Sequence, residues 1–522
     1  MIKILNSLYI KMTNYNITAR LPILYFLFFC AVSAALCFWT VFSLRNGLIS
    51  SAAFVLTSLI VCGVTAYAFF KTIPIKRLFL IFFSLFGFLY IIYIPVFTIV
   101  PDETAHWLRA YEISRGHFIS QKDAETSGGG RVLPKSVFIE SPGFVQDSNT
   151  ANLSQTYRHL FKKMSEKIDR NDTEWMFFPN TAYYSPLTYI FQLPGILAAS
   201  AVSAKAVFIA YAGRISSFII SLIILFFALG AMPAKQKTFF LIALCPVFVQ
   251  EAISLSGDAL INALSFAVIA LILKYSYDEK ILRISTGNLI LISVMFLLVS
   301  LAKIVYVPMI LLFLLLPYQK TASKKYYIWF FAIMAAVIMF LDAGWFYTMK
   351  GYVKDFVPGI IIDPGEQIKY VMTHPFKFTF LVIKTYIVTL PKFAGMFVGL
   401  RIGAKNTFFH VEYIAYFIYM LFIVLTACSE KFYMKIKDKA VILAICVLTG
   451  FAVAGALYAS WNPVGANVID GIQGRYLTPV VLLLAVIINI KKFPLKEETV
   501  FRYALPVVSA TYLFMFSAIL IR

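Results

Sequence analysis

Residues 78–112 read LFLIFFSLFGFLYIIYIPVFTIV-PDETAHWLRAYE, a long apolar run that ends abruptly in a polar segment. A helix of roughly 20 apolar residues crosses the hydrocarbon core of a bilayer, which is about 30 Å thick. The run from 78 to 100 therefore predicts a membrane-spanning helix. The acidic residues after Pro101 mark the point where the chain leaves the bilayer.

The rest of the chain repeats this pattern. Of its 522 residues 61% are hydrophobic and only 14% charged, whereas soluble domains average about 25% charged residues. Apolar runs of spanning length recur from Leu21 to the C-terminus, and we expect an all-α polytopic membrane protein with about 13 transmembrane helices. The net charge of +21 lies mostly in short connectors, so it does not indicate nucleic-acid binding.

The basic connectors predict which loops face the cytoplasm, because cytoplasmic loops carry an excess of Lys and Arg. The turn at 71–77 is basic and is predicted to be cytoplasmic. The loop at 101–183 holds 11 acidic and 10 basic residues, a net charge of −1 that leaves +22 for the remainder. We therefore expect this loop to be extracytoplasmic.

Two apolar tracts are too long for one span. Residues 238–273 and 288–317 both have basic flanks at each end, which predicts a hairpin in each. Glu251 and Asp258 would lie near the outer tip of the first hairpin, and Lys303 at the turn of the second.

The segment 347–407 is the least decided region. Lys377, Lys384 and Lys392 recur at spacings of seven and eight, which places them along one helical face. An amphipathic helix on the outer leaflet is the favoured interpretation, and a further span or re-entrant piece is the alternative.

These patterns divide the chain into three parts. Residues 1–77 form an N-terminal two-span segment, and 78–326 a core with the extracytoplasmic loop 101–183. Residues 327–522 form a C-terminal membrane region, with extracytoplasmic segments at 347–407 and 460–475.

The densest polar cluster follows the span at 78–100. If a helix begins after Pro101, then Asp102, His106 and Arg109 fall at i, i+4 and i+7 on one face. A carboxylate there could take a proton from an attacking hydroxyl, and an arginine could hold a phosphate. The structural alternative is an acidic helix start completed by side chains at the membrane interface.

This cluster resembles the first outer loop of GT-C glycosyltransferases, which are polytopic enzymes that use lipid-phosphate-linked sugars. Further segments resemble elements of these enzymes in the same order. They are Tyr184-Ser185-Pro186-Leu187, where a serine replaces the first proline of the membrane-skimming His/Lys-Pro-Pro-Leu element, Ala212-Gly213-Arg214, Ser256-Gly257-Asp258-Ala259 and Ala302-Lys303.

A closer resemblance is to a bacterial membrane family of unknown function that is grouped with GT-C proteins. Its hallmarks are Pro-Asp-Glu…His…Arg-Ala, Ser-Gly-Asp-Ala and a late Gly-Gln-Gly-Arg-Tyr, which here reads Gly471-Ile472-Gln473-Gly474-Arg475-Tyr476. The resemblance covers roughly 78–310 and 461–480.

The resemblance implies catalytic roles for Asp102, Glu103 and Asp258, with Asp102 as the general base. It implies substrate contacts for His106, Arg109, Arg214, Lys303, Gln473 and Arg475. The structural alternatives are helix capping for Asp102 and Asp258 and snorkelling for Lys303. Whether a divalent cation such as Mg²⁺ or Mn²⁺ takes part stays open.

The implied function is inverting transfer of a sugar from a polyprenyl-phosphate donor to a cell-envelope glycan or lipid-linked acceptor. It would take place on the extracytoplasmic face of a bacterial cytoplasmic membrane. The alternatives are a polymerase or ligase of lipid-linked oligosaccharides, and a flippase or transporter of lipid-linked glycans. A transporter favours two related halves and charges near the midplane, and the sequence shows no such internal repeat.

Overall fold

The computed structural model describes residues 17–44, 48–98, 100–123, 128–138, 162–163, 166–350, 352, 362–399, 410–490 and 492–521. Parts of the predicted loops at 101–183 and 347–407 therefore lie outside the described residues. The described chain is mostly helical, as predicted. Its elements are α2 (Ile17–Ser43), α3 (Leu48–Phe70), α4 (Ile75–Tyr93), α5 (Glu103–Ser114), β1 (Gln121–Lys122), β2 (Gly129–Pro134), η1 (Lys135–Val137), β3 (Thr173–Phe177), α7 (Pro179–Ala182), η2 (Pro186–Tyr189), α8 (Leu193–Val202), α9 (Ala206–Ala231), α10 (Gln236–Ala243), α11 (Pro246–Ala252), α12 (Asp258–Tyr277), α13 (Thr286–Ala302), η3 (Ile304–Leu315), η4 (Tyr318–Lys320), α14 (Lys324–Thr348), α15 (Pro364–Thr373), α16 (Pro375–Val398), α17 (His410–Ser429), α18 (Ile436–Trp461), η5 (Gly474–Leu477), α19 (Thr478–Ile487) and α20 (Glu497–Ile521).

Within the described residues, 8 helices are long and apolar enough to cross a membrane. This agrees with a polytopic membrane protein, while the number of 13 spans stays a prediction. The 8 helices are α2, α3, α4, α9, α12, α14, α18 and α20.

The span predicted at 78–100 differs from the structure at its end. Helix α4 stops at Tyr93, and Ile94 is extended with φ −123° and ψ 91°. The reason is Pro95, because a residue before proline is driven out of the helical conformation. The chain therefore leaves the helix early and reaches Asp102 through a short irregular segment.

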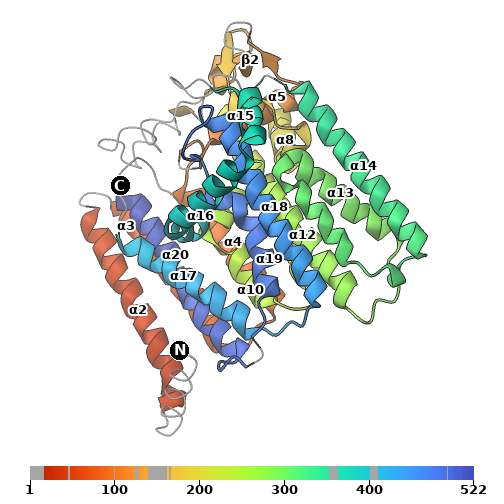
Figure 1. The fold of residues 1–522 in the computed structure, drawn as a ribbon. Coiled ribbons are helices and arrows are strands. Elements are labelled where there is room, and N and C mark those ends of the chain that lie inside the picture. Colours follow the sequence, from red (N-terminus) through yellow and green to blue (C-terminus); the bar gives the residue numbers. More distant parts are fainter. Residues whose placement is uncertain are drawn as a thin grey trace.

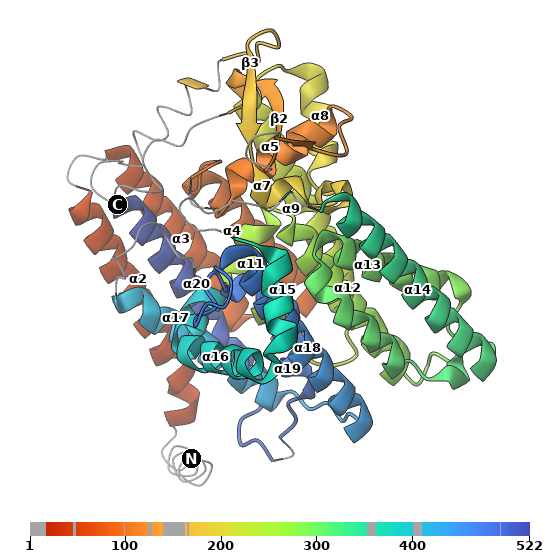
Figure 2. The ribbon, with the colours of Figure 1, turned by 45° about the horizontal axis from the view of Figure 1, so that its top comes forward.

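The helices form one bundle with a small sheet at one end (Figure 1). Helices α2, α3 and α20 lie together on one side, and α13 and α14 lie on the opposite side (Figures 1 and 2). Strands β1, β2 and β3 form an antiparallel sheet in that order, with Gly130 opposite both Gln121 and Phe177. We call the end of the bundle that carries this sheet the sheet end.

The first two described helices, α2 and α3, are hydrogen-bonded to the last helix, α20. The Tyr25 hydroxyl of α2 donates to the Tyr503 carbonyl of α20 at 2.8 Å. Further along the same interface, Thr65 of α3 shares a hydrogen bond of 2.7 Å with Ser509. The N-terminal two-span segment and the last helix therefore make one packed layer.

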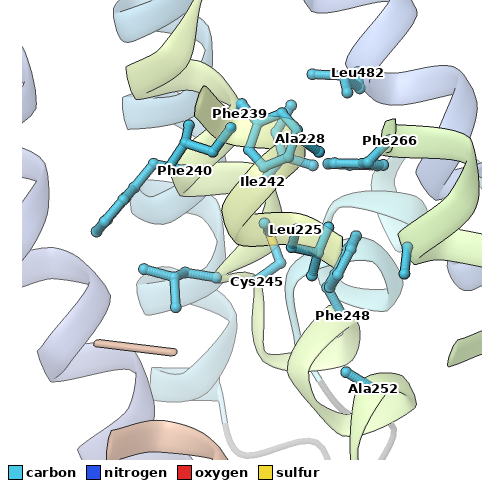
Figure 3. Close-up of a cluster of buried hydrophobic side chains, with 14 of the residues drawn as sticks. Leu225, Ala228, Phe239, Phe240, Ile242, Cys245, Phe248, Ala252, Phe266 and Leu482 are labelled. Carbon is cyan, nitrogen blue, oxygen red and sulfur yellow. The ribbon is translucent and has the colours of Figure 1, made fainter. Parts of the chain in front are cut away.

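The predicted hairpin in 238–273 has its turn where expected, but its first arm is broken. Helices α10 and α11 are separated at Cys245, since Pro246 opens a new helix. Irregular backbone at membrane depth is tolerated where protein covers it, and this break is buried. Figure 3 shows the apolar side chains around it, with Phe239 and Phe240 of α10 and Phe248 of α11 among Leu225, Ala228, Phe266 and Leu482.

Within the undecided segment 347–407, the residues Pro375–Val398 form a single helix, α16. It buries Leu381 and Val382 against α18 and keeps Lys384 exposed. Helix α16 also exposes Phe376 and Phe380. It is not among the 8 candidate spans found in the described residues, and its placement on the outer leaflet stays a prediction.

Candidate functional site

Asp102 lies at the sheet end, directly before α5. Its backbone is left-handed, with φ 61° and ψ 10°, and its side chain makes no capping hydrogen bond to the helix. Left-handed conformations cost energy for residues other than glycine and cluster at functional sites. The Asp102 carboxylate instead accepts from the Asn180 amide at 3.3 Å and from Arg475 Nη2 at 3.2 Å. Helix capping therefore does not explain Asp102.

Arg475 stands between three carboxylates. Besides Asp102, its Nη1 lies 3.4 Å from Glu251 Oε1, and its Nε lies 3.7 Å from Asp258 Oδ2. Asp258 also forms an ion pair with Lys303. We call Asp102, Glu251, Asp258, Lys303 and Arg475 the Arg475 cluster.

Local sequence brings these segments close together. A Cβ on Gly257 would lie 2.1 Å from Thr188 Cγ2, so only glycine allows the turn before Asp258 to close on η2. Gly471 has φ +90°, a value that favours glycine and bends the loop before Arg475. Gly257 thus lets the turn before Asp258 pack on η2, and Gly471 allows the left-handed backbone in the loop that leads to Arg475.

Asp258 does not cap α12. The capping position is Gly257, with no side-chain cap hydrogen bond, whereas the Asp258 side chain reaches Lys303 and Arg475. Lys303 Nζ also lies 4.6 Å from the centre of the Tyr476 ring, and the Lys303 side chain is only 15% exposed. Snorkelling therefore does not describe Lys303, which points into the cluster.

His106 lines the same region as a neutral ring. Its Nδ1 is 2.9 Å from the Tyr189 hydroxyl and its Nε2 is 3.4 Å from Ser256 Oγ. Burial lowers the pKa of His106 to about 4, although Asp102 and Asp258 oppose this shift. The ring stacks on Tyr184 with an interplanar angle of 7°.

Glu103 and Arg214 form a separate, closed pair. Arg214 Nε donates to Glu103 Oε1 at 2.7 Å, and Arg214 Nη2 contacts the other oxygen. The remaining hydrogen-bonding capacity is filled by backbone, since Phe97 N donates to Glu103 and Arg214 Nη1 donates to the Ile94 carbonyl, at 2.9 and 2.7 Å. Both side chains are at most 1% exposed.

Arg109 is also held in a buried ion pair, although its Nε has no hydrogen-bond partner in the described chain. Its Nη1 donates to Glu112 at 2.6 Å, and its Nη2 donates to the carbonyls of Phe118 and Tyr184. Glu112 also accepts from Arg131 Nε at 2.5 Å. This buried network ties α5 to the sheet and fixes the backbone beside Tyr184.

The structure thus separates the nine residues that the sequence singled out. Asp102, His106, Asp258, Lys303 and Arg475 come together at one place. The predicted shared face of α5 holds for Asp102 and His106, whereas Arg109 bonds to Glu112. Glu103 and Arg214 form an ion pair with each other. Gln473 lies half-buried just before η5.

Two members of the site were not chosen from the sequence. Glu251 was placed near the hairpin tip but given no role, and Tyr476 was noted only as part of a motif. An acid inside an apolar tract is costly and commonly functional, a signal that could have identified Glu251. In the described part of the chain, no group of three His, Cys, Asp or Glu side chains is arranged to hold a metal ion.

Residues 82–484 match the model of a family described as "Predicted membrane protein (DUF2142)". The chain belongs to this family. The matched range covers most of the chain and includes the whole Arg475 cluster, while α2, α3 and α20 lie outside it. No curated protein and no solved structure matches the sequence.

Proposed function

We propose that this member of the family is an inverting GT-C-type glycosyltransferase that acts at the sheet end of the bundle. It moves a sugar from a polyprenyl-phosphate donor to a glycan or lipid-linked acceptor of the cell envelope. The sheet end is then the extracytoplasmic face of a bacterial cytoplasmic membrane.

The observation that supports this proposal most is the contact between Asp102 and Arg475. The side chain of Asp102 is 45% exposed and that of Arg475 only 6%. A base that an acceptor can approach therefore adjoins a cation that is shielded from water. Electrostatic interactions are stronger in such shielded places, and a phosphate leaving group needs a cation of this kind.

The contacts of Arg475 are also suited to exchange. Charge-assisted hydrogen bonds are typically about 2.7–2.9 Å long, and Arg214 and Arg109 have bonds of 2.7 and 2.6 Å to their carboxylates. The contacts of Arg475 to Asp102, Glu251 and Asp258 measure 3.2, 3.4 and 3.7 Å. A phosphate can replace these long contacts at lower cost than it could open either closed pair.

In the proposed reaction, the acceptor hydroxyl oxygen attacks the anomeric carbon as the bond from that carbon to the phosphate oxygen breaks. Asp102 takes the hydroxyl proton, and the polyprenyl phosphate leaves with the bonding electron pair. Arg475 and Lys303 stabilise the negative charge on the leaving phosphate. Asp258 holds Lys303 in place through their ion pair.

The test supplies purified protein with polyprenyl-phosphate sugars and membrane acceptors and follows sugar incorporation. The wild type should transfer sugar. Asp102→Asn should lose about 10²–10⁴-fold in turnover, the usual contribution of a positioned general base. The matched control is Asp172→Asn, because Asp172 is an exposed acid that pairs with Lys135 at 2.8 Å in the same outer region.

Each outcome is informative. Near wild-type turnover in Asp102→Asn would remove Asp102 as the base. If the wild type transfers no sugar from any such donor but moves lipid-linked glycan across vesicles, the protein is a transporter.

A further inference from the structure

The buried side of the Arg475 cluster contains two polar atoms that lack hydrogen-bond partners in the described chain. Glu251 Oε2 has none, although Oε1 of the same side chain contacts Arg475. Arg475 Nε also has none, because Asp258 Oδ2 is 3.7 Å away, beyond hydrogen-bonding distance. Both side chains are more than nine-tenths buried. Unmet buried polar groups are costly, so a ligand group or water should complete them.

The chemistry of these two atoms is complementary. A carboxylate oxygen accepts hydrogen bonds, and the guanidinium Nε–H donates one. A hydroxyl group both donates and accepts, so one hydroxyl, or two neighbouring ones, can satisfy both atoms. An ionised Glu251 needs a hydrogen-bond donor, which a phosphate dianion lacks, and Arg475 needs an acceptor, which an ammonium group lacks. The pair therefore fits a hydroxyl-bearing ligand.

Glu251 is held rigidly in this position. The Tyr90 hydroxyl donates to the carbonyl of Pro246 at the start of α11, at 2.7 Å. At the other end, Ser254 Oγ donates to the Glu251 carbonyl at 2.8 Å. A short helix fixed at both ends can present its carboxylate without reorganisation on binding, which favours affinity.

Glu251 Oε2 and Arg475 Nε lie on the opposite side of Arg475 from Asp102, which suggests that they contact the donor sugar. Asp102 lies on the exposed side of Arg475, where an acceptor arrives from outside, whereas Glu251 lies on its buried side. A donor whose phosphate contacts Arg475 would carry its sugar next to both.

We propose that Glu251 Oε2 and Arg475 Nε bind a ring hydroxyl of the transferred sugar and so make Glu251 a donor-recognition residue. This inference rests on the proposed function. It adds that the site recognises the sugar as well as the lipid phosphate.

The test measures binding of two kinds of lipid to purified protein in lipid nanodiscs. One is bare polyprenyl phosphate, and the other is polyprenyl phosphate carrying glucose, galactose, mannose or N-acetylglucosamine. The wild type should bind at least one sugar-bearing lipid more tightly than the bare lipid. Glu251→Gln should weaken binding of that lipid about 10- to 100-fold, as expected for loss of a hydrogen bond to a charged group. Binding of the bare lipid should be unchanged or tighter.

Two further variants keep the test decisive. Asp342→Asn alters another buried acid, on α14 and outside the cluster, and should leave both affinities unchanged. If Glu251→Gln does not fold, Glu251→Asp keeps the charge but withdraws it by one methylene, and it should reduce the preference for the sugar-bearing lipid.

The outcomes separate the two proposals. Equal losses for both lipids in Glu251→Gln would show that Glu251 only supports Arg475, and no loss for either lipid would show that water fills the position. Either result overturns the inference. A wild type that binds the bare lipid with no preference for any of the four sugars also overturns the inference and leaves the phosphate site intact. A wild type that binds neither lipid overturns the proposed function itself.

Discussion

Two arginines at the sheet end of the bundle have opposite surroundings. Arg214 has one carboxylate, Glu103, which it contacts through two nitrogens, and backbone groups fill the remaining positions. Arg475 has three carboxylates, all at 3.2 Å or more, and one nitrogen without a hydrogen bond in the described structure. A matched pair stabilises a fold, whereas an arginine with several weak partners can exchange them for a ligand. Burial alone therefore does not distinguish an arginine that is closed by its partners from one that could exchange them.

The largest expected effect is a loss of stability when Arg214, the closed arginine, is replaced. Arg214→Ala leaves Glu103 buried without its partner, which typically costs about 3–5 kcal/mol. We expect a large fall in the thermal unfolding midpoint in detergent, with little protein reaching the membrane. Arg475→Ala should lower the midpoint much less, because its contacts are long. Equal losses in the two variants would contradict the distinction between closed and open arginines.

The next effect concerns use of the donor. Arg475→Ala should lower the kcat/KM for a polyprenyl-phosphate sugar about 10- to 100-fold, the expected loss for a hydrogen bond to a charged group. Arg475→Lys should recover part of this loss, because a lysine supplies the charge but not the planar fork. Steady-state kinetics over a range of donor concentrations provide the measurement. A kcat/KM unchanged in both variants would remove Arg475 from the donor site.

A smaller effect follows from His106, whose pKa falls from 6.5 to about 4 in the fold. Between these pH values the unfolded chain binds a proton that the folded chain does not, so stability decreases as the pH falls through this window. The loss from pH 6.5 to pH 5 should be about 2 kcal/mol. The thermal midpoint of the wild type should fall more steeply with decreasing pH than that of His106→Gln. Parallel pH profiles would place the pKa of His106 near its ordinary value.

The smallest effect tests the link between Asp258 and Lys303. Lys303→Met and Asp258→Asn should each destabilise the protein, and the double variant should lose less than the two single losses combined. The coupling for groups in direct contact is typically about 0.5–3 kcal/mol, and we expect a value near 1 because Arg475 also contacts Asp258. Thermal midpoints of the four proteins measure it. A coupling of zero would mean that Lys303 and Asp258 act independently.

Much of the molecule could be predicted locally. Apolar runs of spanning length predicted long helices, of which α9, α14 and α18 are examples. The basic flanks of 238–273 and 288–317 correctly predicted a turn in each tract. Basic connectors favour the cytoplasmic side, so a tract with basic residues at both ends is expected to turn back. The end of α4 was missed, although Pro95 signals it.

Which acidic residue pairs with which arginine could not be predicted. Asp102 and Glu103 are adjacent in one motif, yet Asp102 faces Arg475 and Glu103 faces Arg214. Sequence alone could not choose, since either of these two neighbouring acids could pair with either arginine. Their partners lie more than 100 residues away in the chain.

A helical membrane protein with a polar segment after its third apolar run follows from the sequence, because hydrophobicity and charge act locally along the chain. The packing of the helices is what pairs Glu103 with Arg214 and Arg109 with Glu112, and what brings Glu251 to Asp102, Asp258, Lys303 and Arg475. The physical reason is that an ion pair depends on distance and on competing partners, and these are fixed only when separate helices pack together.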